Sequence, residues 1–276
     1  MGLAIAWTHG HFDLVSALLT LAGAVFLHAN VNVLNDYFDF RSGIDLATTP
    51  TPFSGGSTIL PRGLMTPGWV LFLGLMLLVG GLAIGSYFVY LFSFYPLLLA
   101  IIGVAVFSIL SYSLLTSKVG IGELVTGLNF GPLLLLGTYY IQTHSLSLEP
   151  LIAGIPLGIL TAGILYVNEF PDMDADKSRG RNHLVARWGK AKAARNLKPI
   201  LAAAYLVPVV GVLLGLVSPF SLLLLIAVPK AITTSRLVSR NYDKVMELIP
   251  GMASMVMTTL LTGVLMFGGY VASGLV

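Results

Sequence analysis

Two clusters of acidic and amide side chains carry most of the chemistry available to this sequence. The first lies in NVLNDYFDFRSGID and contains Asn32, Asn35, Asp36, Asp39 and Asp45. The second lies in NEFPDMDADKSRGR and contains Asn168, Glu169, Asp172, Asp174, Asp176, Lys177 and Arg181. Each follows a long apolar stretch, which places it where a membrane helix meets water. A carboxylate within the hydrocarbon costs about 3 kcal/mol, so clusters this dense indicate a function.

The spacing of the acids predicts what the clusters can bind. One helical face carries three residues of each: Asn32, Asp36 and Asp39 in the first, and Asn168, Asp172 and Asp176 in the second. Both clusters end apolar helices, and the partial negative charge of a helix C-terminus favours a bound cation. Mg²⁺ takes one or two carboxylates together with substrate phosphate oxygens. Two facing sets therefore predict a site for a divalent cation and a diphosphate.

A bound diphosphate also needs basic partners. Five candidates lie in the same layer: Arg41, Arg62, Lys118, Lys177 and Arg181. The alternative is that the clusters only solvate helix ends beside ordinary basic loops. That alternative explains one cluster about as well as the diphosphate site does, but two matching clusters favour the site.

Composition sets the class of protein. The 276 residues are 56% apolar and 10% charged, and the mean hydropathy is +0.90. A soluble domain carries about a quarter charged residues, so we expect an all-α, polytopic membrane bundle. No hydrophilic stretch is long enough for a second domain, and we expect one transmembrane domain over residues 1–276. The absence of cysteine excludes disulfides and thiolate metal sites. We expect a lipid bilayer and no nucleic acid as partners, and the sequence gives no indication of oligomeric state.

Hydropathy predicts eight spans of about the length that a bilayer requires. They are Leu14–Leu34, Trp69–Tyr90, Leu97–Leu115, Ile121–Ile141, Leu151–Val167, Ile200–Val217, Phe220–Leu237 and Met252–Val271. Short connections alternate with longer charged ones, and all fifteen Lys and Arg lie in or beside the longer ones. The positive-inside tendency then places both acidic clusters on the cytoplasmic face of a cell membrane.

This orientation leaves Met1 outside, in front of a fragment too short to span the bilayer. One interpretation is an ordinary outer N-terminus. The other, which we favour, is that a preceding helix is missing and that Gly2–Trp7 is its outer end.

The two clusters resemble the motifs of the UbiA superfamily of intramembrane prenyltransferases. The family's N-D-x-x-D pattern with a later Asp matches Asn35, Asp36, Asp39 and Asp45, and its D-x-x-x-D pattern matches Asp172 and Asp176. A family Tyr followed by a Lys matches Tyr112 and Lys118. The resemblance covers the whole chain and implies a nine-helix fold whose first helix is absent here.

The resemblance also implies a reaction. Mg²⁺ at Asp36, Asp39, Asp172 and Asp176 would activate a polyprenyl diphosphate, with Tyr112 and Lys118 in the catalytic site. An electron-rich aromatic acceptor would then take the prenyl group. Segments such as GIGELVTGLNFGP are similar to the menaquinone branch, which implies 1,4-dihydroxy-2-naphthoate as acceptor. 4-Hydroxybenzoate and geranylgeranylglyceryl phosphate remain alternatives, and an ion-coupled transporter is the alternative from another class.

Three other polar residues are better explained by structure than by chemistry, and a fourth is explained about equally well by either. We interpret His28 and Asn129 as hydrogen-bonded bundle residues and His183 as a loop residue. Glu123 stands at a helix start, where capping explains it about as well as catalysis does.

Overall fold

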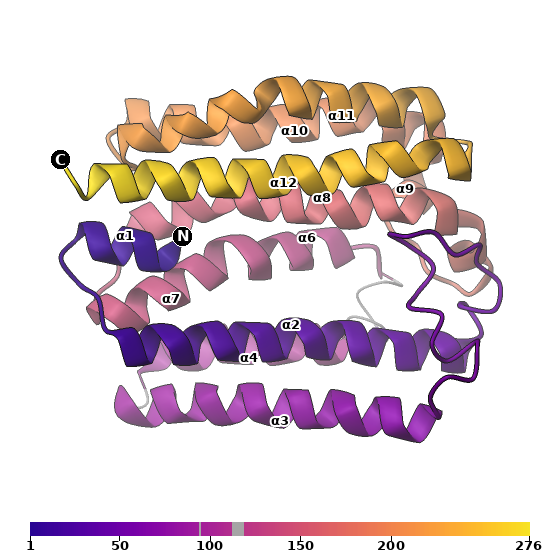
Figure 1. The fold of residues 1–276 in the computed structure, drawn as a ribbon, viewed down its shortest axis with the longest axis horizontal. Coiled ribbons are helices and arrows are strands. Elements are labelled where there is room, and N and C mark those ends of the chain that lie inside the picture. The colour runs from indigo at the N-terminus through magenta and orange to yellow at the C-terminus, as the bar shows by residue number, and fades with distance from the viewer. Residues whose placement is uncertain (94, 112–118) are drawn as a thin grey trace.

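The computed structural model describes residues 1–93, 95–111 and 119–276, and these residues form helices and connecting loops without a strand. The long helices lie side by side along one direction (Figure 1). Seven helical segments are long and apolar enough to cross a membrane. The protein is therefore a multi-pass helical bundle, as the composition predicts.

The elements follow the chain in this order. A short helix, α1 (Gly2–Thr8), precedes α2 (Leu14–Ser42), α3 (Pro67–Leu91) and α4 (Pro96–Ser111). One span then consists of α6 (Gly122–Leu128), the π-helix η2 (Asn129–Leu133) and α7 (Leu134–Thr143). The chain continues with α8 (Leu148–Ser178), α9 (Leu184–Trp188), α10 (Lys190–Leu213), the 3-10 helix η3 (Pro219–Ala227), α11 (Val228–Asn241) and α12 (Val245–Ser273).

Seven of the eight predicted spans coincide with these long segments. The remaining one, Leu97–Leu115, coincides with α4, which is shorter; its last four residues lie outside the described part of the chain. Two predicted spans end too early, because α2 continues to Ser42 and α8 continues through Pro171 to Ser178. Asp36, Asp39, Asp172 and Asp176 consequently lie on the last turns of α2 and α8, in keeping with their helical spacing. Asp45 and Arg181 follow the helix ends.

Local signals explain where α2 begins and ends. The Asp13 side chain caps the first turn by accepting the Ser16 N–H at 2.7 Å. Gly43 ends the helix in the left-handed conformation at φ 77°, which glycine adopts without steric cost. The helix therefore runs unbroken across the bilayer and presents Asp36 and Asp39 at its far end.

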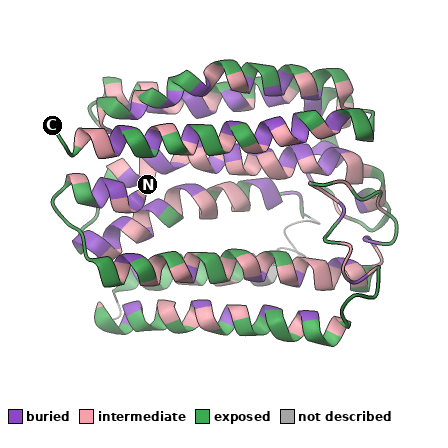
Figure 2. Cartoon of the chain, viewed as in Figure 1, coloured by how far each residue is buried: buried purple, intermediate pink, exposed green. Residues whose placement is uncertain are grey.

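Burial is uneven across the bundle. The main core joins α8, α10, η3, α11 and α12, where Leu197, Leu224 and Met255 are fully buried. The α2 and α3 helices bury few of their apolar side chains, as the colouring in Figure 2 shows. Apolar surface of this kind is suited to contact with lipid, and it leaves space between α2 and the core.

Two pairs of glycines bring α8 against the α6–η2 segment. A Cβ at Gly158 would lie 2.3 Å from the Gly127 carbonyl oxygen, and one at Gly131 would lie 2.4 Å from the Gly154 carbonyl oxygen. Within each segment the two glycines are four residues apart, Gly127 and Gly131 in one and Gly154 and Gly158 in the other. This is the small-xxx-small pattern that lets membrane helices approach closely. This contact holds the α6–η2 segment against α8, with its opposite side toward α2.

Candidate active site

A cavity of about 880 Å³ opens between α2, α3, α4, the α6–α7 span and α8. Residues 44–57, after α2, line its polar end. Apolar residues such as Leu27, Phe88 and Ile102 line much of the remainder. A cavity with one charged end and a long apolar section suits a ligand with a charged head and a hydrocarbon tail.

The first acidic cluster lies at the polar end of this cavity. Asp39 is buried; it accepts the Asn35 amide at 2.9 Å and is paired with Arg181. Asp36 is half-buried, and its Oδ1 accepts the Ser57 N–H at 3.2 Å. The cluster is therefore held partly by α2 itself and partly by the loop that covers it.

Arg181 joins the second cluster to the first. Its guanidinium contacts Asp39 of α2 and lies 3.4 Å from Asp176 Oδ1 of α8. Two further oxygens at the cavity, Asp172 Oδ1 and Asn168 Oδ1, are buried and have no hydrogen-bond partner among the residues that the structure describes. The cluster thus offers oxygens that the protein does not satisfy, which suits a cation or a ligand N–H or O–H donor.

The loop after α2 brings two glycines against the acids. Gly55 and Gly56 have φ of 83° and 72°, and the Gly55 backbone hydrogen bonds to Asp172. A Cβ at Gly56 would lie 2.9 Å from Asp45 Oδ1, so a larger residue would displace that carboxyl group. Burial, followed by the negative charges of Asp39 and Asp36, raises the pKa of Asp45 to about 7. Burial and the neighbouring negative charges thus both favour the neutral form of Asp45, and a bound cation would oppose both effects.

The structure brings most of the predicted site residues together. The cavity is lined by eight of them: Asn32, Asn35, Asp36, Asp39, Asp45, Asn168, Asp172 and Asp176. Of the predicted basic residues that the structure describes, Arg181 lines the cavity, whereas Arg41, Arg62 and Lys177 are exposed and do not. Tyr112 and Lys118 lie outside the described residues.

A second polar group, in which Glu169 and His183 line the cavity, was not predicted as a site. Ligand atoms of Glu123, Glu169 and His183 lie within 4.8 Å of one another, and all three residues are buried. Burial lowers the pKa of His183, but hydrogen bonds to Asp176 and Glu169 outweigh that effect and raise the pKa to about 9.

This group also supports the main site. Glu123 Oε1 accepts the Leu184 N–H at 2.7 Å, and His183 Nε2 lies 3.4 Å from Asp176 Oδ2. The group could hold a metal ion, and it also fixes α9 against α8. Sequence spacing gave no signal for it, because its members come from three separate segments.

Comparisons with known proteins place the chain among prenyltransferases. Residues 1–249 match the UbiA prenyltransferase family. The chain is 27% identical over 274 residues to 1,4-dihydroxy-2-naphthoate octaprenyltransferase of Bacillus subtilis, covering 99% of this chain and 86% of that protein. It is 30% identical over 274 residues to the enzyme of the same name in Mycobacterium tuberculosis, covering 96% of this chain and 89% of that protein.

A solved structure concerning digeranylgeranylglyceryl phosphate synthase shares the fold. It has a TM-score of 0.60 over 99% of this chain and 90% of that chain, at 18% sequence identity. Helical spans, two acidic helix ends on one cavity and the match over residues 1–249 agree with one another. The chain belongs to the UbiA prenyltransferase family and is a membrane-spanning transferase of prenyl groups.

Proposed function

We propose that this protein transfers a polyprenyl group from an allylic diphosphate to 1,4-dihydroxy-2-naphthoate, with Mg²⁺ at the two acidic clusters. The observation that carries the proposal is the cavity with acids from α2 and α8 at one end and an apolar section beyond them. The names of the two relatives support the acceptor and the octaprenyl class of donor.

The residues at the polar end fit a hydrated Mg²⁺. Asp36, Asp39, Asp172 and Asp176 supply the hard oxygen ligands that this ion prefers, and Asp172 Oδ1 has no hydrogen-bond partner in the described part of the chain. When bound, Mg²⁺ neutralises the diphosphate and makes it a better leaving group. The same four residues would otherwise repel a diphosphate.

Other groups of the chain would act on the donor directly. Arg181 lies between the two clusters, where it would stabilise the charge that develops on the leaving oxygen as the C1–O bond breaks. The family resemblance implies the same role for Lys118 and a catalytic role for Tyr112, both of which lie outside the described residues. The loop containing Gly55 and Gly56 covers the carboxylates and would limit the access of water to the allylic cation.

The apolar section would hold the first isoprene units of the donor. Because α2 and α3 expose apolar side chains, a longer tail would continue between helices into lipid. With a dihydroxynaphthoate acceptor, loss of the carboxyl group as carbon dioxide would complete the reaction. Both clusters would lie at the cytoplasmic face of a cell membrane, in keeping with the basic residues beside them.

A transfer assay in nanodiscs tests this function. Labelled geranylgeranyl diphosphate is combined with dihydroxynaphthoate, 4-hydroxybenzoate or geranylgeranylglyceryl phosphate, each with Mg²⁺ and with EDTA. Mg²⁺-dependent product with the naphthoate alone is expected. Product with a different acceptor would refute the assigned substrate, and failure to bind the diphosphate would refute the enzyme mechanism and favour ion-coupled transport.

A further inference from the structure

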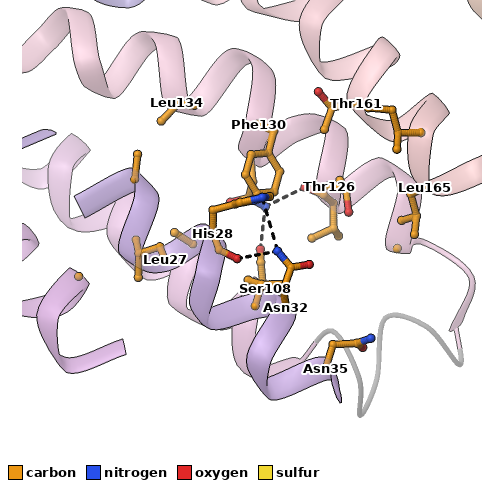
Figure 3. A pocket seen from close by; sticks show the side chains of 18 of the residues that line it. Leu27, His28, Asn32, Asn35, Ser108, Thr126, Phe130, Leu134, Thr161 and Leu165 are labelled. Atoms are coloured by element: carbon orange, nitrogen blue, oxygen red, sulfur yellow. Dashed lines mark hydrogen bonds between the residues drawn. The ribbon is translucent and has the colours of Figure 1, made fainter. Parts of the chain in front are cut away.

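Polar side chains continue into the cavity beyond the carboxylates. His28 and Asn32 line the cavity from α2, and Ser108 and Thr126 line it as well (Figure 3). Asn129 is a further lining residue, and the helical spacing puts Asp36 on the same α2 face as His28 and Asn32. Along α2, Asn32 lies about 6 Å and His28 about 12 Å from Asp36, at 1.5 Å per residue. This inner polar group, defined as His28, Asn32, Ser108, Thr126 and Asn129, is therefore within the membrane span.

The hydrogen bonds of His28 and Asn32 leave their polar atoms accessible to a ligand. Asn32 Nδ2 donates to the His28 backbone oxygen at 3.1 Å and lies 3.5 Å from His28 Nε2. Both of these contacts are within α2, and both side chains are exposed to the cavity. Because the Asn32 amide is a donor, the contact assigns His28 Nε2 as an acceptor.

A π-helix places an aromatic ring beside this pair. Phe130 belongs to η2, and its ring meets the His28 ring edge-on, with centroids 5.1 Å apart (Figure 3). Single π-helical turns occur frequently at functional sites. Here the turn directly follows the Gly127–Gly158 contact, which sets Phe130 toward α2. An aromatic edge and two polar side chains together suit a flat ring that bears oxygen substituents.

The polyprenyl tail cannot form hydrogen bonds with the polar side chains that line this part of the cavity. Polar side chains within a membrane span are costly and mark a functional site by default. A hydrocarbon tail offers them no hydrogen bond, and the diphosphate belongs with the carboxylates at the end of α2. The other reactant is the one that needs polar recognition at this depth.

We propose that His28, Asn32 and Phe130 form the subsite for the acceptor, a planar aromatic acid with a hydroxyl group beside its carboxylate. This assignment rests on the proposed function. His28 Nε2 accepts the hydroxyl hydrogen, Asn32 Nδ2 donates to the same oxygen, and Phe130 packs against the ring.

The subsite gives His28 a catalytic role in a balanced step. As the C1–O bond breaks, its electron pair leaves with the diphosphate, and the ring carbon bonds to C1. The hydroxyl proton passes to His28 Nε2, and the oxygen becomes a ketone. If the attacked carbon bears the carboxylate, the product is a β-keto acid. It loses carbon dioxide, and the oxygen regains the proton from His28.

Binding of an acceptor analogue tests the subsite without relying on turnover. The probe is 1-hydroxy-2-naphthoate, titrated by its fluorescence against wild type, His28→Ala, Asn32→Ala and Thr20→Val. Thr20 also lines the cavity on α2, but its hydroxyl donates to the Ser16 carbonyl oxygen, so it is the matched control. We expect His28→Ala and Asn32→Ala each to weaken binding about tenfold and Thr20→Val to leave it unchanged.

Two donor measurements complete the test. Binding of geranylgeranyl thiodiphosphate should keep its wild-type affinity in His28→Ala, because the diphosphate belongs with the carboxylates. The slow release of diphosphate from geranylgeranyl diphosphate without acceptor should be unchanged in the control Thr20→Val. Unchanged naphthoate binding in both variants, or lost donor binding in His28→Ala, would overturn the subsite. If the analogue depends on His28 but no acceptor is prenylated, the subsite stands and the proposed function fails. If the wild type binds and ionises the donor but not the naphthoate, the donor chemistry stands and the subsite fails.

Discussion

Substituting one glycine of the α8 contact should damage both stability and catalysis. In Gly158→Ala, the new Cβ would lie 2.3 Å from the Gly127 carbonyl oxygen, whereas ordinary contact begins at 3.4 Å. The two backbones must therefore separate by about 1 Å, and overpacking of this kind costs about 1–3 kcal/mol. The displaced segment carries Asn129 and Phe130 into the cavity. A 1 Å misplacement of substrate-positioning groups can lower the rate by about 10²-fold.

The matched control is Gly268→Ala in α12, where a Cβ would meet no atom within 4 Å. Replacing an unhindered helical glycine with alanine stabilises by about 1 kcal/mol at most. Thermal unfolding in detergent and the prenyl-transfer rate are measured for both variants. We expect a midpoint several degrees lower and a slower rate in Gly158→Ala only. Equal midpoints and rates in the two variants would refute the close contact and its role in forming the cavity wall.

Three further substitutions probe other parts of the structure. Arg181→Gln removes the positive charge that contacts Asp39 and Asp176. We expect the unfolding midpoint of this variant to fall in EDTA and to recover partly when Mg²⁺ is added. An equal fall in EDTA and in Mg²⁺ would contradict the bridging role of Arg181. Glu149→Ala, about 35 Å from Asp172 along α8, leaves the Tyr270 hydroxyl without its acceptor at 3.0 Å. We expect it to lose about 2 kcal/mol of stability by thermal unfolding with both KM values unchanged, and changed KM values at a permissive temperature would contradict that separation. Gly56→Ala forces a side chain against Asp45 at a φ of 72°; we expect a higher KM for the diphosphate in steady-state kinetics, and a wild-type KM would show that the loop does not close over the acids.

Hydropathy predicted most of the helices, because a helix that crosses a bilayer must contain an apolar stretch of a fixed minimum length. The apolar spans that it predicted end at Leu34 and Val167, whereas the helices continue to Ser42 and Ser178. Gly43, in the left-handed conformation, ends α2 after Asp36 and Asp39, and α8 continues through Pro171.

Spacing predicted the part of the polar cavity whose residues repeat on one helix face, whereas Asp45 was predicted from the family pattern and Arg181 from its charge. Asp36 and Asp172 met that condition, and both line the cavity. The Glu123–Glu169–His183 group did not, because tertiary packing alone brings its members together. His28 was interpreted as a bundle residue because the sequence does not show whether a face meets another helix or a cavity.

The central claim is that carboxylates from two helices jointly bind the cation and the diphosphate. Equilibrium binding of geranylgeranyl thiodiphosphate, titrated with Mg²⁺, tests it most directly in wild type, Asp36→Asn and Asp172→Asn, with folding verified by circular dichroism and gel filtration. We expect Mg²⁺-dependent binding in the wild type and its loss in either variant. Mg²⁺-dependent binding at wild-type affinity in either folded variant would contradict it.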